Sequence, residues 1–241
     1  MTHAGLFKTW ATVLAAILAS IILSVAAFTT GARAQEQPAC SYPDKVVLDP
    51  GHGGTDSGAI NQINQTIQLK EKDQNLLVAQ GLAELLGEHN ICAVLTRTDD
   101  RHLTNTERAN IANDTGADIL VSIHMNGSTQ ETVDYTTTLY GKPRKDKELA
   151  YALFGGSVKP PSYGLRTLPA ADGKGTIATR TPYQFASGVL LKSNMPAVIA
   201  ESVFITNSTE GDLLYYGTGM RQDQIEEALR SGIEQYLATH K

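Results

Sequence analysis

Short apolar runs alternate with helix-like segments along the first half of this chain, and this alternation limits the fold more than any other feature. Apolar runs at 46–48, 91–96 and 119–123 have the length of buried strands. Between them, residues 71–86 carry apolar residues at helical spacing, and 104–113 opens with a capping-box pattern. Strand, helix and strand in this order require right-handed crossovers. We therefore predict an α/β fold, a mostly parallel twisted sheet with helices on both faces.

The second half of the chain is less regular. A strand is predicted at 135–140 and a helix at 145–154, followed by loops rich in Gly, Pro and Thr. An apolar strand at 197–200 ends at Glu201, and an amphipathic helix begins at about Asp223. No internal repeat or second domain is visible in the sequence. We expect a single domain.

The N-terminal segment has the layout of a secretory signal peptide. Lys8 precedes a predominantly apolar run at 10–28, and an Ala-Arg-Ala cleavage site ends at Ala34. The alternative is an uncleaved anchor, because the run approaches the roughly 20 residues of a membrane-spanning helix. In either case the rest of the chain is exported, to the periplasm or to the extracellular cell wall. The predicted divisions are a signal peptide at 1–34, an N-terminal extension at 35–44 and a catalytic domain at 45–241.

Charge and cysteine content restrict the partners and suggest one crosslink. The chain has 20 Lys and Arg against 25 Asp and Glu, a net charge of -5, so a nucleic-acid-binding function is disfavoured. We expect no contact with the membrane once the signal peptide is removed. In an oxidising compartment Cys40 and Cys92 permit one intramolecular disulfide. Two buried free thiols are the alternative, since sequence does not establish the separation of the two residues.

Four residues with metal or acid–base chemistry converge in the predicted fold. His52, His124 and Glu201 each follow a predicted strand, and Glu71 begins the first crossover helix. Ligands of open α/β sheets bind beyond the carboxyl ends of the strands. Two His and one carboxylate form the protein ligand set of a hydrolytic zinc site, and a second carboxylate serves as general base. Each residue taken alone is weak evidence, because a single His at a strand end is more often a hydrogen-bonded structural residue. Asp49 could orient a ligand imidazole, or cap the turn that follows it.

With these residues placed, the sequence resembles the zinc-dependent N-acetylmuramoyl-L-alanine amidases of the family 3 type. Six blocks run in order across nearly the whole exported part of the chain, and together they are specific. The matching blocks are Val46–Gly54 (VVLDPGHGG), Glu71–Leu76 (EKDQNL), Val94–Arg97 (VLTR), Arg108–Asn110 (RAN), Ala117–Asn126, which ends in SIHMN, and Met195–Glu201 (MPAVIAE) continuing to Phe204–Asn207 (FITN).

The resemblance implies a role for each of the four residues. His52, Glu71 and His124 look like the ligands of Zn²⁺, and Glu201 looks like the catalytic glutamate. The implied reaction is hydrolysis of the amide between N-acetylmuramic acid and L-alanine in peptidoglycan, releasing stem peptides. We expect a monomer, and the sequence identifies no activator. Met125 and Val203 depart from the usual family pattern, and we expect them to reshape the pocket wall.

Two other readings use the same residues. A zinc carboxypeptidase or endopeptidase cutting within the stem peptide would need the same four side chains, and a non-catalytic peptidoglycan-binding regulator could keep the fold. The second is disfavoured because all four positions are filled. Arg166, Lys174 and Arg180 could pair with carboxylates of the peptide, although ordinary charges on a solvated loop are the favoured interpretation.

Overall fold

The computed structural model describes residues 41–155 and 163–240. The predicted signal peptide at 1–34 and most of the extension at 35–44 lie outside these residues, as does Cys40. Cys92 is disulfide-bonded, and its predicted partner lies outside the described part of the chain. Residues 39–241 belong to one compact unit, in agreement with the prediction of a single catalytic domain.

A six-stranded mixed sheet forms the centre of the domain. Four of its strands are parallel, β6 is antiparallel to β8, and β7 is parallel to β6, so the predicted mostly parallel α/β sheet is confirmed. Strands β1, β5 and β8 therefore present their carboxyl ends at the same edge of the sheet. The strand order is β4 (Ile91–Leu95), β1 (Asp44–Pro50), β5 (Ile119–Asn126), β8 (Ala197–Phe204), β6 (Thr137–Tyr140) and β7 (Tyr183–Gln184).

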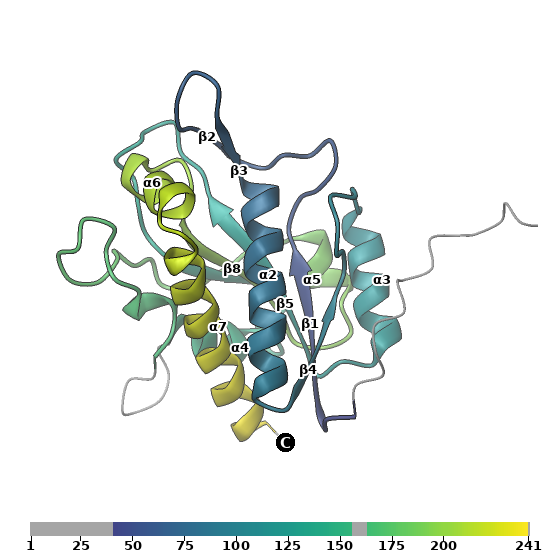
Figure 1. The fold of residues 1–241 in the computed structure, drawn as a ribbon. Helices are drawn as coiled ribbons and strands as arrows, with labels where there is room; N and C mark the ends of the chain where they lie inside the picture. The colour runs from purple at the N-terminus through teal and green to yellow at the C-terminus, as the bar shows by residue number, and fades with distance from the viewer. Residues whose placement is uncertain (1–40, 156–162, 241) are drawn as a thin grey trace, which may run out of the picture. The chain divides into compact units, whose positions relative to one another are not determined.

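Helices cover both faces of this sheet. Helices α2 (Glu71–Glu88) and α7 (Met220–Thr239) lie side by side across one face, with α4 (Lys147–Phe154) beside α7 (Figure 1). Helices α3 (Asn105–Thr115) and α5 (Gly188–Lys192) pack together on the other face. Two further elements complete the described part, α6 (Ser208–Tyr216) after β8 and a small hairpin of β2 (Ile60–Gln62) and β3 (Gln68–Lys70) before α2.

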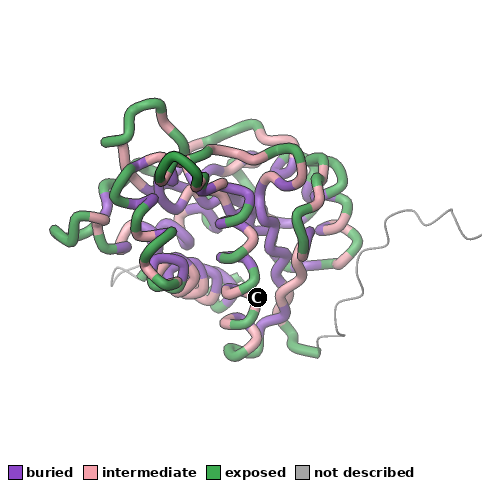
Figure 2. The backbone as a smooth tube through the Cα atoms, turned by 45° about the horizontal axis from the view of Figure 1, so that its top comes forward, coloured by how far each residue is buried: buried purple, intermediate pink, exposed green. Residues whose placement is uncertain are grey.

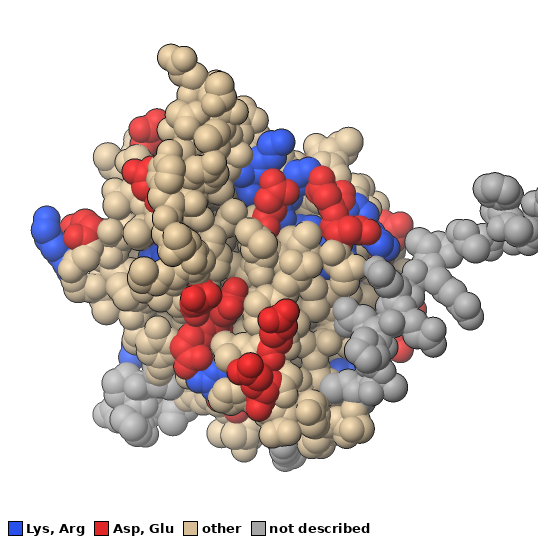
Figure 3. Space-filling view, in the orientation of Figure 1, with Lys and Arg blue, Asp and Glu red and all other residues tan. Residues whose placement is uncertain are grey.

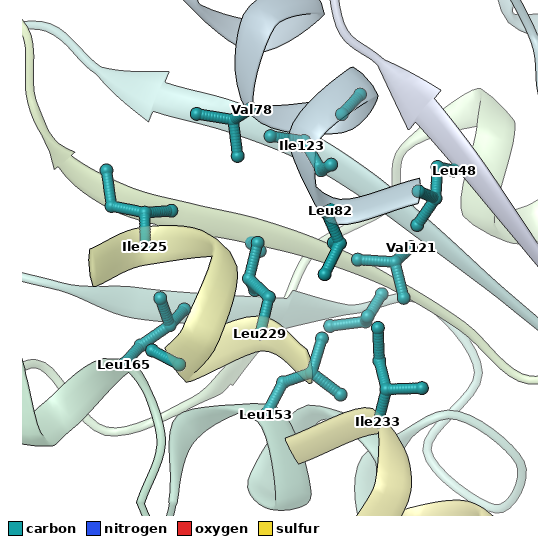
Figure 4. Packing of buried hydrophobic residues seen from close by; sticks show 14 of the residues in the cluster. Leu48, Val78, Leu82, Val121, Ile123, Leu153, Leu165, Ile225, Leu229 and Ile233 are labelled. Carbon is teal, nitrogen blue, oxygen red and sulfur yellow. The ribbon is translucent and has the colours of Figure 1, made fainter. Parts of the chain in front are cut away.

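The larger hydrophobic core fixes the position of α2 on the sheet. Buried residues line the inner sides of the helices and the sheet between them (Figure 2). Leu82 of α2 and Leu229 of α7 point toward Val121 of β5 (Figure 4). Burying one such leucine contributes about 2 kcal/mol. A helix held by several of them places its first residue, Glu71, in a fixed position at the sheet edge.

Alternation along the strands directs two site residues to the same face. In β8, Ile199 belongs to the smaller core between the sheet and helices α3 and α5, so the step of two residues places Glu201 on that face. In β5, Leu120 belongs to the same smaller core, and two steps of two residues lead from Leu120 to His124, which therefore lies on that face as well. His124 and Glu201 are also direct partners in the β5–β8 ladder. The two side chains therefore project side by side.

The predicted ends of these two strands are wrong. The sequence ends them at His124 and Glu201, but β5 continues to Asn126 and β8 continues to Phe204. Pairing resumes after a register shift with Asn126 opposite Phe204, so ladder hydrogen bonds extend the strands beyond their apolar parts. The sequence also gives no signal for the hairpin, α5, α6 or β7, where polar or short segments form the elements. In the described residues no helix is both long and apolar enough to cross a membrane.

Candidate metal centre

Three side chains from separate elements meet at the carboxyl edge of the sheet. His52 lies in the loop after β1, Glu71 is the first residue of α2 and His124 lies in β5. Glu71 Oε1 is 3.1 Å from His52 Nε2 and 3.0 Å from His124 Nδ1. The three donor atoms all lie within 4.8 Å of one another. The structure thus brings together the three residues that the sequence assigned as metal ligands.

The loop after β1 takes an unusual backbone path to place His52. His52 has φ 60°, a left-handed conformation that is rare for a non-glycine residue and recurs at functional sites. Gly51 packs against the other imidazole, because a Cβ there would lie 2.2 Å from the His124 ring. Gly58 has φ +63°, and a Cβ there would lie 2.4 Å from Glu71 Oε2. Two glycines therefore make room for the triad.

Two buried arginines hold the same loop through its carbonyl groups. Arg97 donates to the carbonyls of Pro50 and Gly51 at 2.9 Å each. Arg108 donates to the carbonyls of Pro50 at 2.7 Å and of His52 at 2.6 Å. Both arginines belong to the sequence blocks that carry the family resemblance. Their role is to fix the path of the backbone that presents His52.

Asp56, a residue that the sequence did not single out, fixes the tautomer of His52. Its Oδ2 lies 2.9 Å from His52 Nδ1, so a proton on Nδ1 leaves the lone pair of Nε2 directed at the triad. Asp49 was the sequence candidate for this role, and that prediction is wrong. Asp49 is buried, pairs with Arg108 at 2.7 Å and accepts from Thr96 and Ser122 at 2.6 Å each. It neither contacts an imidazole nor caps the turn.

Glu71 accepts several hydrogen bonds from the protein in addition to its contacts with the imidazoles. Besides the imidazoles, the Met125 amide donates to Oε1 at 3.1 Å and the Ala59 amide donates to Oε2 at 2.8 Å. The Asn75 side chain donates to Oε1 at 3.2 Å from one turn further along α2. These donors hold the carboxylate in one orientation and favour its charged form.

The titration behaviour of the triad follows from these contacts. Burial raises the pKa of Glu71, but hydrogen bonds and charges from His124 and His52 outweigh it and hold the pKa well below its usual range. Burial lowers the pKa of His52, but Glu71 and Asp56 outweigh it and raise the pKa to about 9. Glu71 and Glu201 likewise raise the pKa of His124 against the effect of burial. A bound cation would take the place of the imidazole protons.

Glu201 differs from Glu71 in having no donors of this kind. Its Oε2 is buried and has no hydrogen-bond partner among the described residues. Burial is the main cause that raises the pKa of Glu201 to about 6, with His124 acting in the opposite direction and Glu71 adding to the rise. Glu201 is therefore a carboxylate poised to exchange a proton near neutral pH, beside the triad.

The donor set fits a divalent metal ion. Two imidazole nitrogens and a carboxylate oxygen converge, and the second nitrogen of His52 is tied to Asp56, as is usual for a metal-bound histidine. Three protein ligands leave a coordination position for water or substrate, which is the arrangement of a catalytic site. Glu201 is the partner of His124 in the sheet, so an acid–base group lies next to the open coordination site.

The family model for N-acetylmuramoyl-L-alanine amidase matches residues 46–235, a range that includes the triad and Glu201. The chain belongs to this family. The amidase is 31% identical over 224 residues to the N-acetylmuramoyl-L-alanine amidase AmiA of Escherichia coli K12, a match covering 80% of this chain and 75% of AmiA. The activity of the family, hydrolysis of the amide between N-acetylmuramic acid and L-alanine, is accordingly the activity of this chain.

Solved structures agree with the assignment of the amidase fold. The N-acetylmuramoyl-L-alanine amidase of Clostridium difficile 630 superposes with a TM-score of 0.70 at 31% identity, covering 83% of this chain and all 100% of that one. The CwlD amidase of Clostridioides difficile, solved in complex with the GerS lipoprotein, gives a TM-score of 0.66 at 28% identity and covers 81% and 98%. The likeness therefore extends over nearly the whole domain.

The side chains of the two sequence departures from the family pattern point away from the site, although the Met125 amide donates to Glu71. Met125 and Val203 are both buried in the larger core, on the helix α2 and α7 side of the sheet. Their side chains fill the larger core, so the expectation that they reshape the pocket wall is wrong. Of the loop cations, Lys174 is exposed and 3.8 Å from Asp172, whereas Arg180 reaches the hydroxyl of Tyr135 at 3.4 Å.

Proposed function

We propose that this amidase is a zinc enzyme in which His52, Glu71 and His124 are the metal ligands and Glu201 is the general base. The observation that carries the proposal is the convergence of three donor atoms within 4.8 Å beside a buried carboxylate that has no donor of its own. Two histidines and one glutamate with an open position are a ligand set of hydrolytic zinc sites.

The chemistry divides between the metal and Glu201. Zn²⁺ at such a site supplies a Lewis acid that activates water and polarises a carbonyl oxygen. Glu201 accepts the proton of the attacking water and returns it to the departing amine of L-alanine. A carboxylate whose pKa is about 6 is ionised at pH 7 and still gives up its proton readily, which suits both steps.

We also propose that the enzyme is exported and acts on the cell wall. Residues 1–34 have the layout of a signal peptide, followed by an extension at 35–44 and the zinc amidase catalytic domain at 45–241. Peptidoglycan is the expected substrate, and the domain is expected to act as a monomer. Sequencing the N-terminus of the secreted protein tests the cleavage after Ala34.

Digestion of purified peptidoglycan tests the metal, the reaction and the bond together. Zinc-loaded protein should release peptides that begin with L-alanine and leave an intact glycan, as identified by mass spectrometry. Chelator-treated protein should release none, and added zinc should restore the release. Fragments cut within the stem peptide would instead indicate a carboxypeptidase or endopeptidase, and binding without cleavage would indicate a regulator. Either result would overturn the proposal.

A substitution separates the base from the metal ligands. Glu201→Gln should retain zinc at the wild-type stoichiometry but lower the rate of hydrolysis about 10²- to 10⁴-fold, the range for loss of a general base. Zinc content is measured by atomic spectroscopy and the rate by peptide release. Glu88→Gln, at the exposed end of α2, is the matched control and should change neither quantity. Wild-type hydrolysis by Glu201→Gln would remove Glu201 from the mechanism.

A further inference from the structure

An arginine framed by two tyrosines lies on the same face of the sheet as Glu201. Thr137 of β6 is the ladder partner of Glu201, and Thr136 forms an isolated bridge with Thr179. The amide of Arg180 donates to the carbonyl of Thr136 at 2.9 Å, which places Arg180 beside Thr137. Alternation then directs the Arg180 side chain to the face that Thr137 shares with Glu201.

Two tyrosine rings hold the guanidinium group. The carbon Cζ of Arg180 lies 4.4 Å from the ring centre of Tyr183, within the range of a cation–π contact. Its Nη1 donates to the Tyr135 hydroxyl at 3.4 Å. Tyr135 in turn packs on Phe204 with ring centres 4.6 Å apart, so the Tyr135 ring is anchored to the end of β8. Arg180 is thus positioned by aromatic contacts rather than left to move freely.

No carboxylate neutralises Arg180 in the described part of the chain. Arg180 is exposed and forms no ion pair there. Four other arginines do pair with carboxylates, namely Arg101, Arg108, Arg221 and Arg230. In a chain with a net charge of -5, Arg180 is thus an unneutralised cation two strand positions from Glu201. Burial raises the pKa of Tyr183, with Arg180 acting in the opposite direction and the charges of Tyr135 and Glu201 adding to the rise.

The distance between Arg180 and Glu201 suits a substrate carboxylate that lies close to the amide bond that is cut. Two strand spacings of about 4.8 Å separate Arg180 from Glu201, which is about 10 Å between Cα atoms. An extended peptide advances about 3.5 Å per residue, so two residues beyond the scissile bond cover about 7 Å. The long side chain of Arg180 covers the remainder. A peptide carboxylate one or two residues beyond the scissile amide is therefore within reach.

We propose that Arg180, Tyr135 and Tyr183 form a subsite that binds a carboxylate of the stem peptide. The inference rests on the amidase reaction proposed above. In that substrate the lactyl carboxyl of muramic acid is consumed in the amide that is cut, so the anionic groups that remain near the bond belong to the peptide. A guanidinium group offers a carboxylate two parallel hydrogen bonds, and the Tyr183 ring on one side leaves its edge available for them.

Soluble muramoyl peptides test the subsite, with kcat and KM measured for three compounds on the zinc-loaded enzyme. The first has free carboxylates at the second residue and at the C-terminus, and the other two replace one of these carboxylates with a carboxamide. Arg180→Gln should raise KM about 5- to 10-fold for the first compound with little change in kcat. The increase should disappear with whichever carboxamide removes the contacted carboxylate, which also locates the contact. Arg180→Lys should recover part of the loss.

The controls separate binding from structure and from the reaction itself. Lys174→Gln, an exposed cation of the same loop tract, should leave KM unchanged for all three compounds. An equal rise in KM for all three compounds with Arg180→Gln would mean that Arg180 only supports the loop, and no rise for any compound would mean that it does not contact substrate. Either result overturns the subsite. If wild-type enzyme cleaves none of the three, the proposed function fails instead.

Discussion

Two carboxylates at helix α2, the buried Glu71 and the partly buried Glu226, have opposite surroundings. At the first residue of the helix, Glu71 accepts hydrogen bonds from the Ala59 and Met125 amides and from Asn75, in addition to the two imidazoles. Near its middle, the Glu226 carboxylate of α7 lies against Gly81, where a Cβ would be 2.4 Å from both carboxylate oxygens. Glu226 has no hydrogen-bond partner among the described residues.

The difference shows that donors, rather than burial, decide the charge of a carboxylate. Cationic and amide donors keep Glu71 ionised in spite of its burial. Burial, together with the like charges of Asp223 and Glu84, raises the pKa of Glu226 to about 7. Acidic side chains gather over α2 and α7 on this face of the molecule, so little there offsets the charge of Glu226 (Figure 3). Substitutions at the metal centre and at the interface between α2 and α7 should therefore have different effects.

Removing Glu71 should have the largest effect. Glu71→Ala eliminates one of the three proposed metal ligands and leaves the Ala59 and Met125 amides without their acceptor. Zinc content should fall well below one per chain, and peptidoglycan hydrolysis should drop to the level of chelator-treated enzyme. Glu88→Ala removes a carboxylate from the other end of the same helix and should change neither measurement. Full zinc content and activity in Glu71→Ala would exclude Glu71 as a ligand.

The sequence predicted the members of the metal centre better than their supports. Strand ends and the start of a crossover helix follow from apolar patterning, and these positions alone brought His52, Glu71, His124 and Glu201 to one edge. Asp56 could not be found in this way. It reaches His52 only because Gly53 and Gly54 reverse the chain with positive φ, and a pattern of apolar residues does not specify the path of such a loop.

The helix interface and the loop tract were harder to predict for different reasons. The sequence pattern places Glu226 on the polar side of an amphipathic helix, but the missing side chain of Gly81 lets α2 approach α7 and partly bury the Glu226 carboxylate. That contact depends on two residues far apart in the sequence. Arg180 belongs to a tract without periodicity, and its position depends on one bridge between Thr136 and Thr179. Tertiary pairing fixes both positions, so local sequence carries no signal for them.

Removing the charge of Asp56 should have an intermediate effect. Asp56→Asn keeps an acceptor for the Gly58 amide but no longer supports His52 with a negative charge. Zinc affinity should fall about tenfold, at the lower end of the range for partners of metal-bound histidines. Hydrolysis should return to the wild-type rate at higher zinc concentration, as measured in a zinc titration with activity as readout. Asp172→Asn, on the exposed loop, should leave the titration unchanged, whereas equal affinity in Asp56→Asn and wild type would remove Asp56 from the site.

The smallest expected effect of the three is at Glu226, and its size depends on pH. The pKa of Glu226 is higher in the folded protein than its ordinary value of 4.5, so the folded state binds the proton more tightly than the unfolded state. The stability that this provides is fully present below about pH 4.5 and is lost as pH rises through about 7. At pH 8 the ionised carboxylate destabilises the fold, so Glu226→Gln should be more stable than wild type by about 1 kcal/mol, allowing for its partial exposure.

Urea unfolding of metal-free wild type and variant at pH 5 and pH 8 measures this difference, because other titrating groups cancel in the comparison. The advantage of Glu226→Gln should shrink toward zero at pH 5, where wild-type Glu226 is mostly protonated. Glu84→Gln removes one neighbouring charge from α2 and should stabilise by a few tenths of a kcal/mol at pH 8 only. A gain in Glu226→Gln that is the same at both pH values would show that shape, not charge, limits packing at Gly81.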